Sequence, residues 1–107
     1  MNLQDIINGN GEIKQSPGGY KFKELAPRIT CNDGTTLSVQ ASETHYCTPC
    51  SNYGPYSHLE VGYPSSVPHP AMMEYAEEPI HPTNTVYGYV PVEIVEEFIN
   101  IHGGEKE

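Results

Sequence analysis

The sequence predicts an α+β domain, in which a small antiparallel sheet of three or four strands is covered by one C-terminal helix and preceded by a mobile N-terminal arm. Three observations lead to this fold class. Apolar and polar residues alternate in two segments, an Asp-Gly pair separates two extended runs, and an apolar stripe at helical spacing lies near the C-terminus. The 107 residues suffice for one domain with one modest core.

Residues 1–28 predict a partly flexible arm that lies outside the core. The sequences NGNGE and SPGG are typical of turns and linkers, and they follow one short helix expected at Leu3 to Ile7. The division therefore places the arm at 1–28 and a single α+β domain at 29–107.

The strands are expected from residue 29 onward. Asp33-Gly34 favours a hairpin turn between two extended runs, and Leu37, Val39 and Ala41 then alternate with polar residues. The segment SHLEVGY repeats this alternation and predicts a third strand. TVYGYV predicts a fourth, in which Gly88 indicates a bulge or a close backbone approach.

Between the third and fourth strands, residues 64–84 hold five of the ten prolines around a short helical segment, AMMEYAEE. The C-terminal helix should start near Pro91 and stop at Gly103. Its apolar stripe, which would pack on the sheet, consists of Ile94, Val95, Phe98, Ile99 and His102.

Charge is distributed unevenly along the chain. Residues 1–28 carry a net charge of +1, whereas residues 29–107 carry −10, with Lys106 as their only basic residue. A domain without cationic side chains does not neutralise phosphates along a groove, so we expect no direct nucleic-acid binding. The same charge favours a basic protein partner, and acidity that serves only to keep the chain in solution is the alternative.

No run of about 18 apolar residues occurs, and the first residues lack the basic start and apolar middle of a signal peptide. We therefore expect no membrane association, a location in the cytoplasm, and reduced cysteines.

The sequence HYCTPC, residues 45–50, allows three chemical interpretations. Cys31, His45, Cys47 and Cys50 would form a closed structural zinc site if the hairpin brought them together. A redox C-x-x-C pair is the second interpretation, although the following SNYGPY would break the helix that such pairs precede. A nucleophilic pair of His45 and Cys47 is the third. We favour a shaped loop without a cofactor, and keep zinc as the alternative.

Four segments of the chain, ITCNDGTTLSVQAS, HYCTP, GPYSHLEVGYPS and TVYGYVPVEIVEEFINIHGG, resemble a group of small hypothetical proteins of tailed phages and prophages. The likeness covers roughly residues 29–104 and leaves the arm unmatched. It implies a phage origin rather than a particular reaction. In the group's pattern an arginine follows CTP where this chain has Cys50, which argues against a four-ligand metal site.

Two sets of residues are candidates for binding. A host protein would be contacted by acidic and aromatic residues in and beside the loops, namely Glu74, Tyr75, Glu77, Glu78, Tyr53, Tyr56 and Glu60. In the alternative, a signalling nucleotide would be held by polar groups of the second strand and the loop that follows it, namely Ser38, Gln40, Ser42, His45 and Tyr46.

The sequence as a whole favours a non-enzymatic acidic protein of phage type that inhibits a host factor by stoichiometric association. The expected partner is a basic, nucleic-acid-handling protein, so that the role would be counter-defence of the anti-CRISPR kind. A nucleotide sponge and a zinc-stabilised small fold are the alternatives, and the oligomeric state stays open, with a homodimer among the options.

Overall fold

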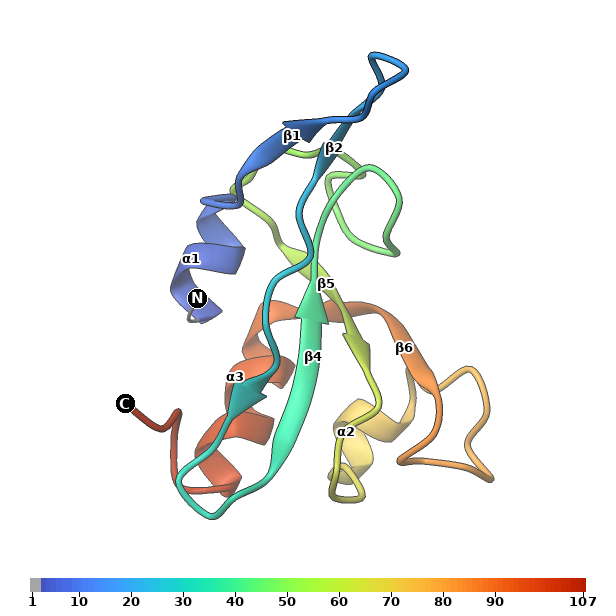
Figure 1. Cartoon of the computed structure of the whole chain (residues 1–107). Coiled ribbons are helices and arrows are strands. Elements are labelled where there is room, and N and C mark those ends of the chain that lie inside the picture. Colours follow the sequence, from blue (N-terminus) through green and yellow to red (C-terminus); the bar gives the residue numbers. More distant parts are fainter. Residues whose placement is uncertain (1–2) are drawn as a thin grey trace.

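The computed structural model describes residues 3–107, which form two antiparallel sheets and three helices (Figure 1). The larger sheet has four strands in the order β3-β4-β5-β6, and β1 and β2 form a separate hairpin. In chain order the elements are α1 Leu3–Asn8, β1 Ile13–Gln15, β2 Lys21–Lys23, β3 Ile29–Thr30, β4 Thr36–Gln40, β5 His58–Gly62, α2 Pro70–Met73, β6 Val86–Pro91 and α3 Val92–Ile101. The predicted α+β class, with an antiparallel sheet and a C-terminal helix, is confirmed.

The turn between β3 and β4 forms at the predicted Asp33-Gly34 pair, where Gly34 has a φ of +92°. The alternation predicted for β4 and β5 sets the faces of the sheet: Leu37, Val39, Leu59 and Val61 are fully buried, whereas the residues between them are only partly covered or small. One face of the sheet therefore carries the core.

Strand β6 contains the irregularity expected at Gly88. Leu59 pairs with Val90 and Val61 with Tyr87, so that two residues of β6 lie opposite Glu60 of β5. This is a β-bulge. The backbone also comes close to a neighbour, because a Cβ atom at Gly88 would lie 3.2 Å from the Cβ of Tyr46.

Helix α3 packs on the buried face as the apolar stripe predicts, with Val95, Phe98 and Ile99 in the core. Pro91 precedes the helix as its N-cap residue, and Gly103 follows the C-cap His102 with a φ of +90°. Helix α2 is shorter than AMMEYAEE suggests. The helix ends at Met73, and the residues that follow it bond to β6 instead: Ala76 pairs with Tyr87, and the N–H of Glu77 donates to the Val86 carbonyl at 3.0 Å.

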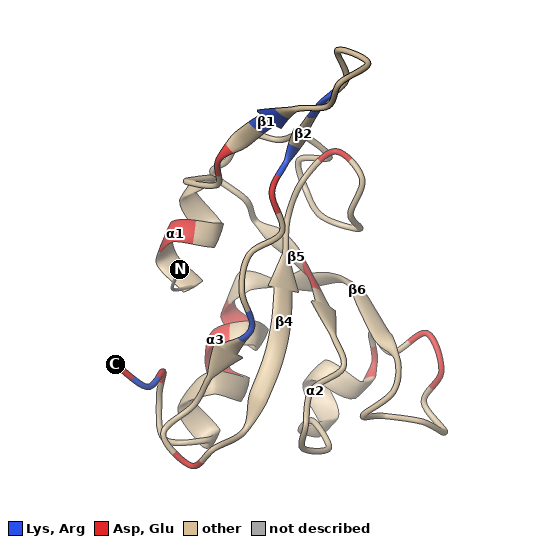
Figure 2. Cartoon of the chain, in the orientation of Figure 1, with Lys and Arg blue, Asp and Glu red and all other residues tan. Residues whose placement is uncertain are grey.

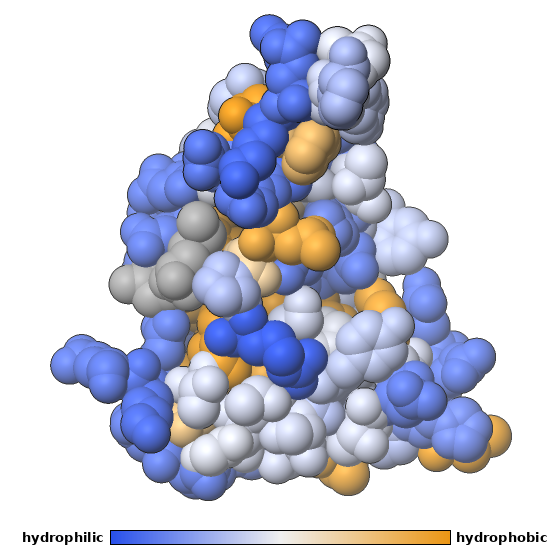
Figure 3. Space-filling model, in the orientation of Figure 1, coloured by the Kyte–Doolittle hydropathy of each residue, from blue (hydrophilic) through white to orange (hydrophobic). Residues whose placement is uncertain are grey.

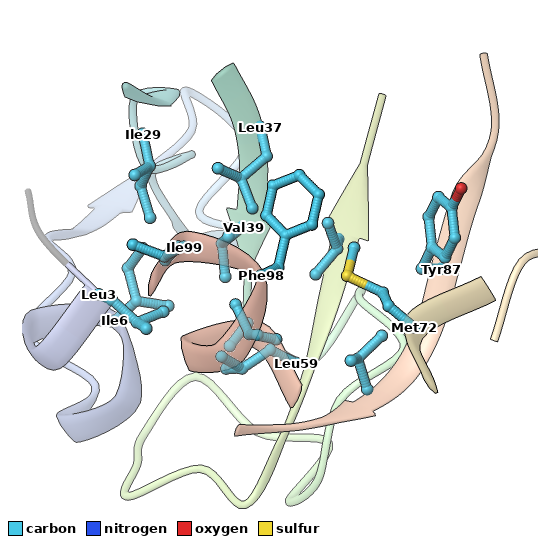
Figure 4. Packing of buried hydrophobic residues seen from close by; sticks show 14 of the residues in the cluster. Leu3, Ile6, Ile29, Leu37, Val39, Leu59, Met72, Tyr87, Phe98 and Ile99 are labelled. Carbon is cyan, nitrogen blue, oxygen red and sulfur yellow. The ribbon is translucent and has the colours of Figure 1, made fainter. Parts of the chain in front are cut away.

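The N-terminal 28 residues differ from the expectation of an arm outside the core. Leu3 and Ile6 of α1 are 6% and 2% exposed and belong to the core cluster. Figure 4 shows them beside Ile99 of α3. The apolar side chains of this short helix thus cover core surface that the sheet and α3 leave uncovered, and the part that projects from the body is the β1–β2 hairpin (Figure 1).

Both outer strands of the four-stranded sheet have backbone neighbours. The N–H of Lys106 donates to the Thr30 carbonyl at 2.8 Å, and Cys31 pairs with Glu105, so the C-terminal segment covers β3. On the other side, the N–H of Tyr89 donates to the Tyr46 carbonyl at 2.9 Å, in addition to the contacts from residues 76 and 77. Within residues 3–107, no helix has the length and apolar character needed to cross a bilayer.

Candidate functional site

The HYCTPC segment belongs to the loop that connects β4 to β5, and hydrogen bonds fix its shape. The N–H of Thr48 donates to the His58 carbonyl at 3.0 Å, and the N–H of Ser57 donates to the Thr48 carbonyl at 2.9 Å. The N–H of Tyr46 donates to a carboxylate oxygen of Glu60 at 2.8 Å. The loop is therefore held against the start and middle of β5.

The three thiols lie in different surroundings. Cys47 is buried and its Sγ donates to the Ser42 carbonyl at 3.2 Å, whereas Cys50 is exposed. Cys31 is buried in the core beside the C-terminal segment. Burial raises the pKa of both Cys31 and Cys47. A raised thiol pKa lowers the thiolate fraction, so neither buried thiol is activated as a nucleophile or an attacking redox group.

The residues proposed as zinc ligands lie in different surroundings. In the part of the chain from residue 3 to residue 107, no group of three or more His, Cys, Asp or Glu side chains is placed to hold a metal ion. The Nδ1 of His45 lies 2.6 Å from the Oγ of Ser42, and the Cys47 thiol is directed at backbone carbonyls. The structure thus does not bring Cys31, His45, Cys47 and Cys50 together as one ligand set.

The polar residues considered for a nucleotide are bonded within the chain. The N–H of Ala26 donates to Oε1 of Gln40 at 2.9 Å, while Nε2 of Gln40 donates to the Ala26 carbonyl at 2.8 Å and to Oγ of Ser38 at 3.0 Å. Ser42 is 3% exposed and contacts both Thr44 and His45. These bonds tie residue 26 to β4 and order the loop.

A small cavity lies beside these groups, lined partly by Lys23, Gln40, Ser42 and His45, and its volume is about 10 Å³. That volume is close to the lower limit for a single water molecule. Burial lowers the pKa of both Lys23 and His45. No observation on these residues favours a nucleotide.

The residues proposed to contact a protein partner divide into separate places. Glu74, Glu77 and Glu78 are exposed beside the half-buried Tyr75 on the segment that follows α2. The neighbouring Met72 does not belong to this surface, because it is fully buried in the core. The exposed apolar residue here is instead Ile80, at 86%.

Tyr53, Tyr56 and Glu60 lie elsewhere. Tyr56 is 3% exposed, and its hydroxyl donates to the Ser51 carbonyl at 2.7 Å. Burial, followed by the effect of the nearby Cys47, raises its pKa to about 12. Tyr56 is therefore a core residue, and its prediction as a contact residue is wrong. Tyr53 is 67% exposed, and Glu60 lies on the sheet face opposite the core, where its register partner is Gln40.

Residues 77–84 form a loop, here called the acidic loop, whose backbone is tightly bonded. The N–H of Glu78 donates to the Thr85 hydroxyl at 3.0 Å, and the hydroxyl of the buried Tyr87 donates to the Pro82 carbonyl at 2.6 Å. The N–H of His81 donates to the Glu78 carbonyl at 2.9 Å. In Figure 3 a hydrophobic patch marks the outer tip of the segment between α2 and β6, next to hydrophilic atoms. The loop thus presents Ile80 close to Glu77 and Glu78 in a defined conformation.

Helix α3 carries a second group of acids. Glu93, Glu96 and Glu97 line a shallow depression with Asn100 and Ile101. Figure 2 shows acidic positions on α3 and on the acidic loop, while basic positions are concentrated on the β1–β2 hairpin. The two acidic groups are therefore separated from most of the cations.

A polar cluster at the C-terminal end of α3 was missed by the sequence analysis. His102 Nδ1 lies 2.7 Å from a carboxylate oxygen of Asp33 and 3.1 Å from the Thr35 hydroxyl, which in turn contacts Ser66 at 3.0 Å. The pKa of Asp33 is lowered mainly by the hydrogen bond that its carboxylate accepts from the N–H of Thr35, and to a smaller extent by its hydrogen bond with His102. The cluster joins the NDG turn to the HGG ending, and these two motifs were the only available signal for it.

No protein-family model, no curated protein and no solved structure matches this chain.

Proposed function

We propose that this chain is a non-enzymatic acidic protein that binds a basic, nucleic-acid-handling host protein and inhibits it by stoichiometric association. In this proposal the protein acts in the host cytoplasm as a phage counter-defence factor of the anti-CRISPR kind. The sequence resemblance supports the phage origin, and the charge distribution supports the choice of partner.

The observation that carries the proposal is the absence of Lys and Arg from residues 29–105, combined with the exposure of most of the acids in that region. Acids on the acidic loop and on α3 have no lysine or arginine of the same region to pair with. A surface of this kind attracts a positively charged groove, accelerates encounter and competes with nucleic acid for it.

The acidic loop supplies a defined contact within this surface. A loop that is already ordered loses less conformational entropy on binding than a flexible one. Ile80 offers an apolar side chain that would be desolvated at the centre of the contact, with Glu77 and Glu78 at its rim. This arrangement suits a basic groove that contains an apolar pocket.

The proposal is tested by capture followed by inhibition. The tagged chain is incubated with bacterial lysate at about 0.05 M and about 0.5 M salt, and nucleic-acid-binding proteins retained only at low salt are purified. Each is then assayed on its nucleic acid with increasing amounts of the chain. We expect inhibition that is complete near one chain per target and that weakens with salt, since screening shortens the Debye length from about 14 Å to about 4 Å over this range.

Two variants make the test specific to the acidic loop. Ile80→Ser and the double variant Glu77→Gln, Glu78→Gln should each weaken inhibition at least about tenfold, the effect of losing about 1.4 kcal/mol of binding free energy. Val67→Ser is the matched control, because Val67 is also an exposed loop residue, at 63%. Inhibition that is independent of salt, or that needs far less than one chain per target, would contradict the proposal.

A further inference from the structure

Two exposed tyrosines are held in an unfavourable backbone conformation. Tyr63 has a φ of 48° and Tyr89 a φ of 54°, and each is 50% exposed. Bulky residues rarely adopt positive φ, and such strain is concentrated at functional positions. Neither ring is required to fill the core, since both are half in solvent. The two positions thus retain tyrosine at a cost in local stability.

Tyr89 lies in the bulge of β6, at the sheet face that the helices leave uncovered. The core residues of α1, α2 and α3 all pack on the opposite face. On the uncovered face, Ser38 pairs with Gly62 and Gln40 with Glu60, and Tyr46 lies against Gly88 with its ring 5.8 Å from that of Tyr89. This face, called the open face below because no helix packs on it, is partly covered by residue 26 and the 45–50 loop, and combines Ser38 and Gly62 with an aromatic pair.

The open face also carries one charge of each sign. Arg28 Nη2 donates to the Thr36 hydroxyl at 3.1 Å and to the Tyr63 carbonyl at 2.6 Å, which places the guanidinium near the start of β4. Glu60 is the register partner of Gln40, at the end of β4. Four residues of strand separate the two positions by roughly 13 Å. Figure 2 shows the strands of this sheet with few other charged residues.

These charges indicate which molecule the open face fits. A basic partner is drawn to the acidic loop and α3, not to the face that holds Arg28. For a second copy of the chain, which has a net charge of −9, the open face offers a positive and a negative group that can each meet its opposite, whereas the acidic loop and α3 offer only negative groups. In a two-fold dimer, a contact between one residue of the first copy and another residue of the second copy occurs twice, once in each direction. Arg28 of each copy can therefore reach Glu60 and the Tyr46–Tyr89 pair of the other.

We propose that the chain forms a two-fold symmetric homodimer through its open face, with Arg28 of each copy placed against Glu60 and Tyr89 of the other. The acidic loops and the exposed sides of α3 then remain free in both copies. The dimer does not depend on the function proposed above, and either can fail while the other stands.

Sedimentation velocity of the purified chain from about 10 μM to about 1 mM, a range that spans weak association, tests this proposal. The mass should rise from 11.8 kDa toward twice that value. Arg28→Glu and Tyr89→Asn should remain monomeric at concentrations where the wild-type chain is dimeric. Because asparagine tolerates positive φ, Tyr89→Asn should melt no lower than the wild-type chain does as a monomer. Lys21→Glu and Tyr53→Asn, on the hairpin and on another exposed loop, are the controls for charge and for aromatic loss.

A charge exchange gives the decisive result. Arg28→Glu and Glu60→Arg should each fail to self-associate, because positions 28 and 60 then carry charges of the same sign. When the two variants are mixed they should form a 1:1 heterodimer, because each contact between position 28 of one chain and position 60 of the other then joins an acid to a base. A wild-type chain that stays monomeric at all concentrations, assemblies larger than a dimer, or a dimer that Arg28→Glu and Tyr89→Asn leave unchanged would overturn the proposal. Equal weakening by the two controls would do the same.

Discussion

Replacing Ile6 by alanine tests whether the N-terminal helix is part of the domain. Ile6 is 2% exposed and packs in the core cluster, within a segment whose sequence predicts a mobile arm. The change removes roughly three methylene-sized groups at about 0.8 kcal/mol each, and a cavity adds to this loss. We therefore expect Ile6→Ala to lower the free energy of unfolding by about 3 to 4 kcal/mol.

Urea unfolding followed by circular dichroism measures this change, with thermal melting as a second readout. At about 4–8 °C per kcal/mol for a domain near this size, the Tm should fall by at least about 12 °C. Leu25→Ala is the matched control from the same segment, because Leu25 is 67% exposed, and its effect should stay within about 0.5 kcal/mol. If Ile6→Ala and Leu25→Ala had the same small effect, the packing of α1 on the core would be refuted.

Three further predictions concern backbone approach, pH and thiol access. Gly54→Ala should destabilise the fold by about 1–3 kcal/mol, because the added Cβ would lie 2.8 Å from backbone atoms of residues 7 and 8. Gly18→Ala, where the nearest atom to the added Cβ is Oγ of Ser16 at 4.0 Å, is the control in the same thermal melts. The pKa of Asp33 is lowered by folding, so its contribution to stability is complete above its ordinary pKa of about 4 and is lost as the pH falls through the lower folded value. Urea midpoints between pH 6 and pH 2.5 should therefore fall less steeply for Asp33→Asn, and parallel curves would contradict the assignment. Iodoacetamide at neutral pH should add one group, at the exposed Cys50, whereas the two buried thiols react only in urea; mass spectrometry that finds rapid triple labelling of the folded chain would show the burial to be wrong.

The parts of the fold that the sequence predicted are those governed by local chemistry. The Asp33-Gly34 turn, the alternation in β4 and β5, the irregularity at Gly88 and the stripe of α3 each depend on a few consecutive residues. Propensity and periodicity act at this range, so the pattern contains the information.

The predictions that failed depend on residues that are distant in sequence. No residue near Leu3 in the sequence indicates that this helix packs beside Ile99. Tyr56 likewise has the sequence context of an exposed loop tyrosine, and its burial depends on a contact with a distant segment, in which its backbone N–H donates to the Ile7 carbonyl. Likewise, the spacing of Cys47 and Cys50 in C-x-x-C is compatible with several chemistries, and only the burial of one thiol and the exposure of the other distinguish them.

The candidate site was predicted in part for the same reason. Composition identified the acidic residues after α2, because charge is additive along a sequence. It did not single out Ile80, because exposure depends on tertiary packing: Met72 is buried in the core, whereas Ile80 is 86% exposed. The positive φ of Tyr89 has no sequence signal, since tyrosine is one of the last residues expected there.

The occupied outer strands of the four-stranded sheet have a consequence for how the chain behaves when it is abundant. Unpaired strand edges recruit further chains into ribbons and fibrils. Here the C-terminal tail lies along β3, and residues 46, 76 and 77 lie along β6, so the backbone of this sheet offers no template on either flank. The stoichiometric inhibition proposed above requires the chain to reach the concentration of its target, and the covered flanks remove the strand-edge route to polymerisation at that concentration.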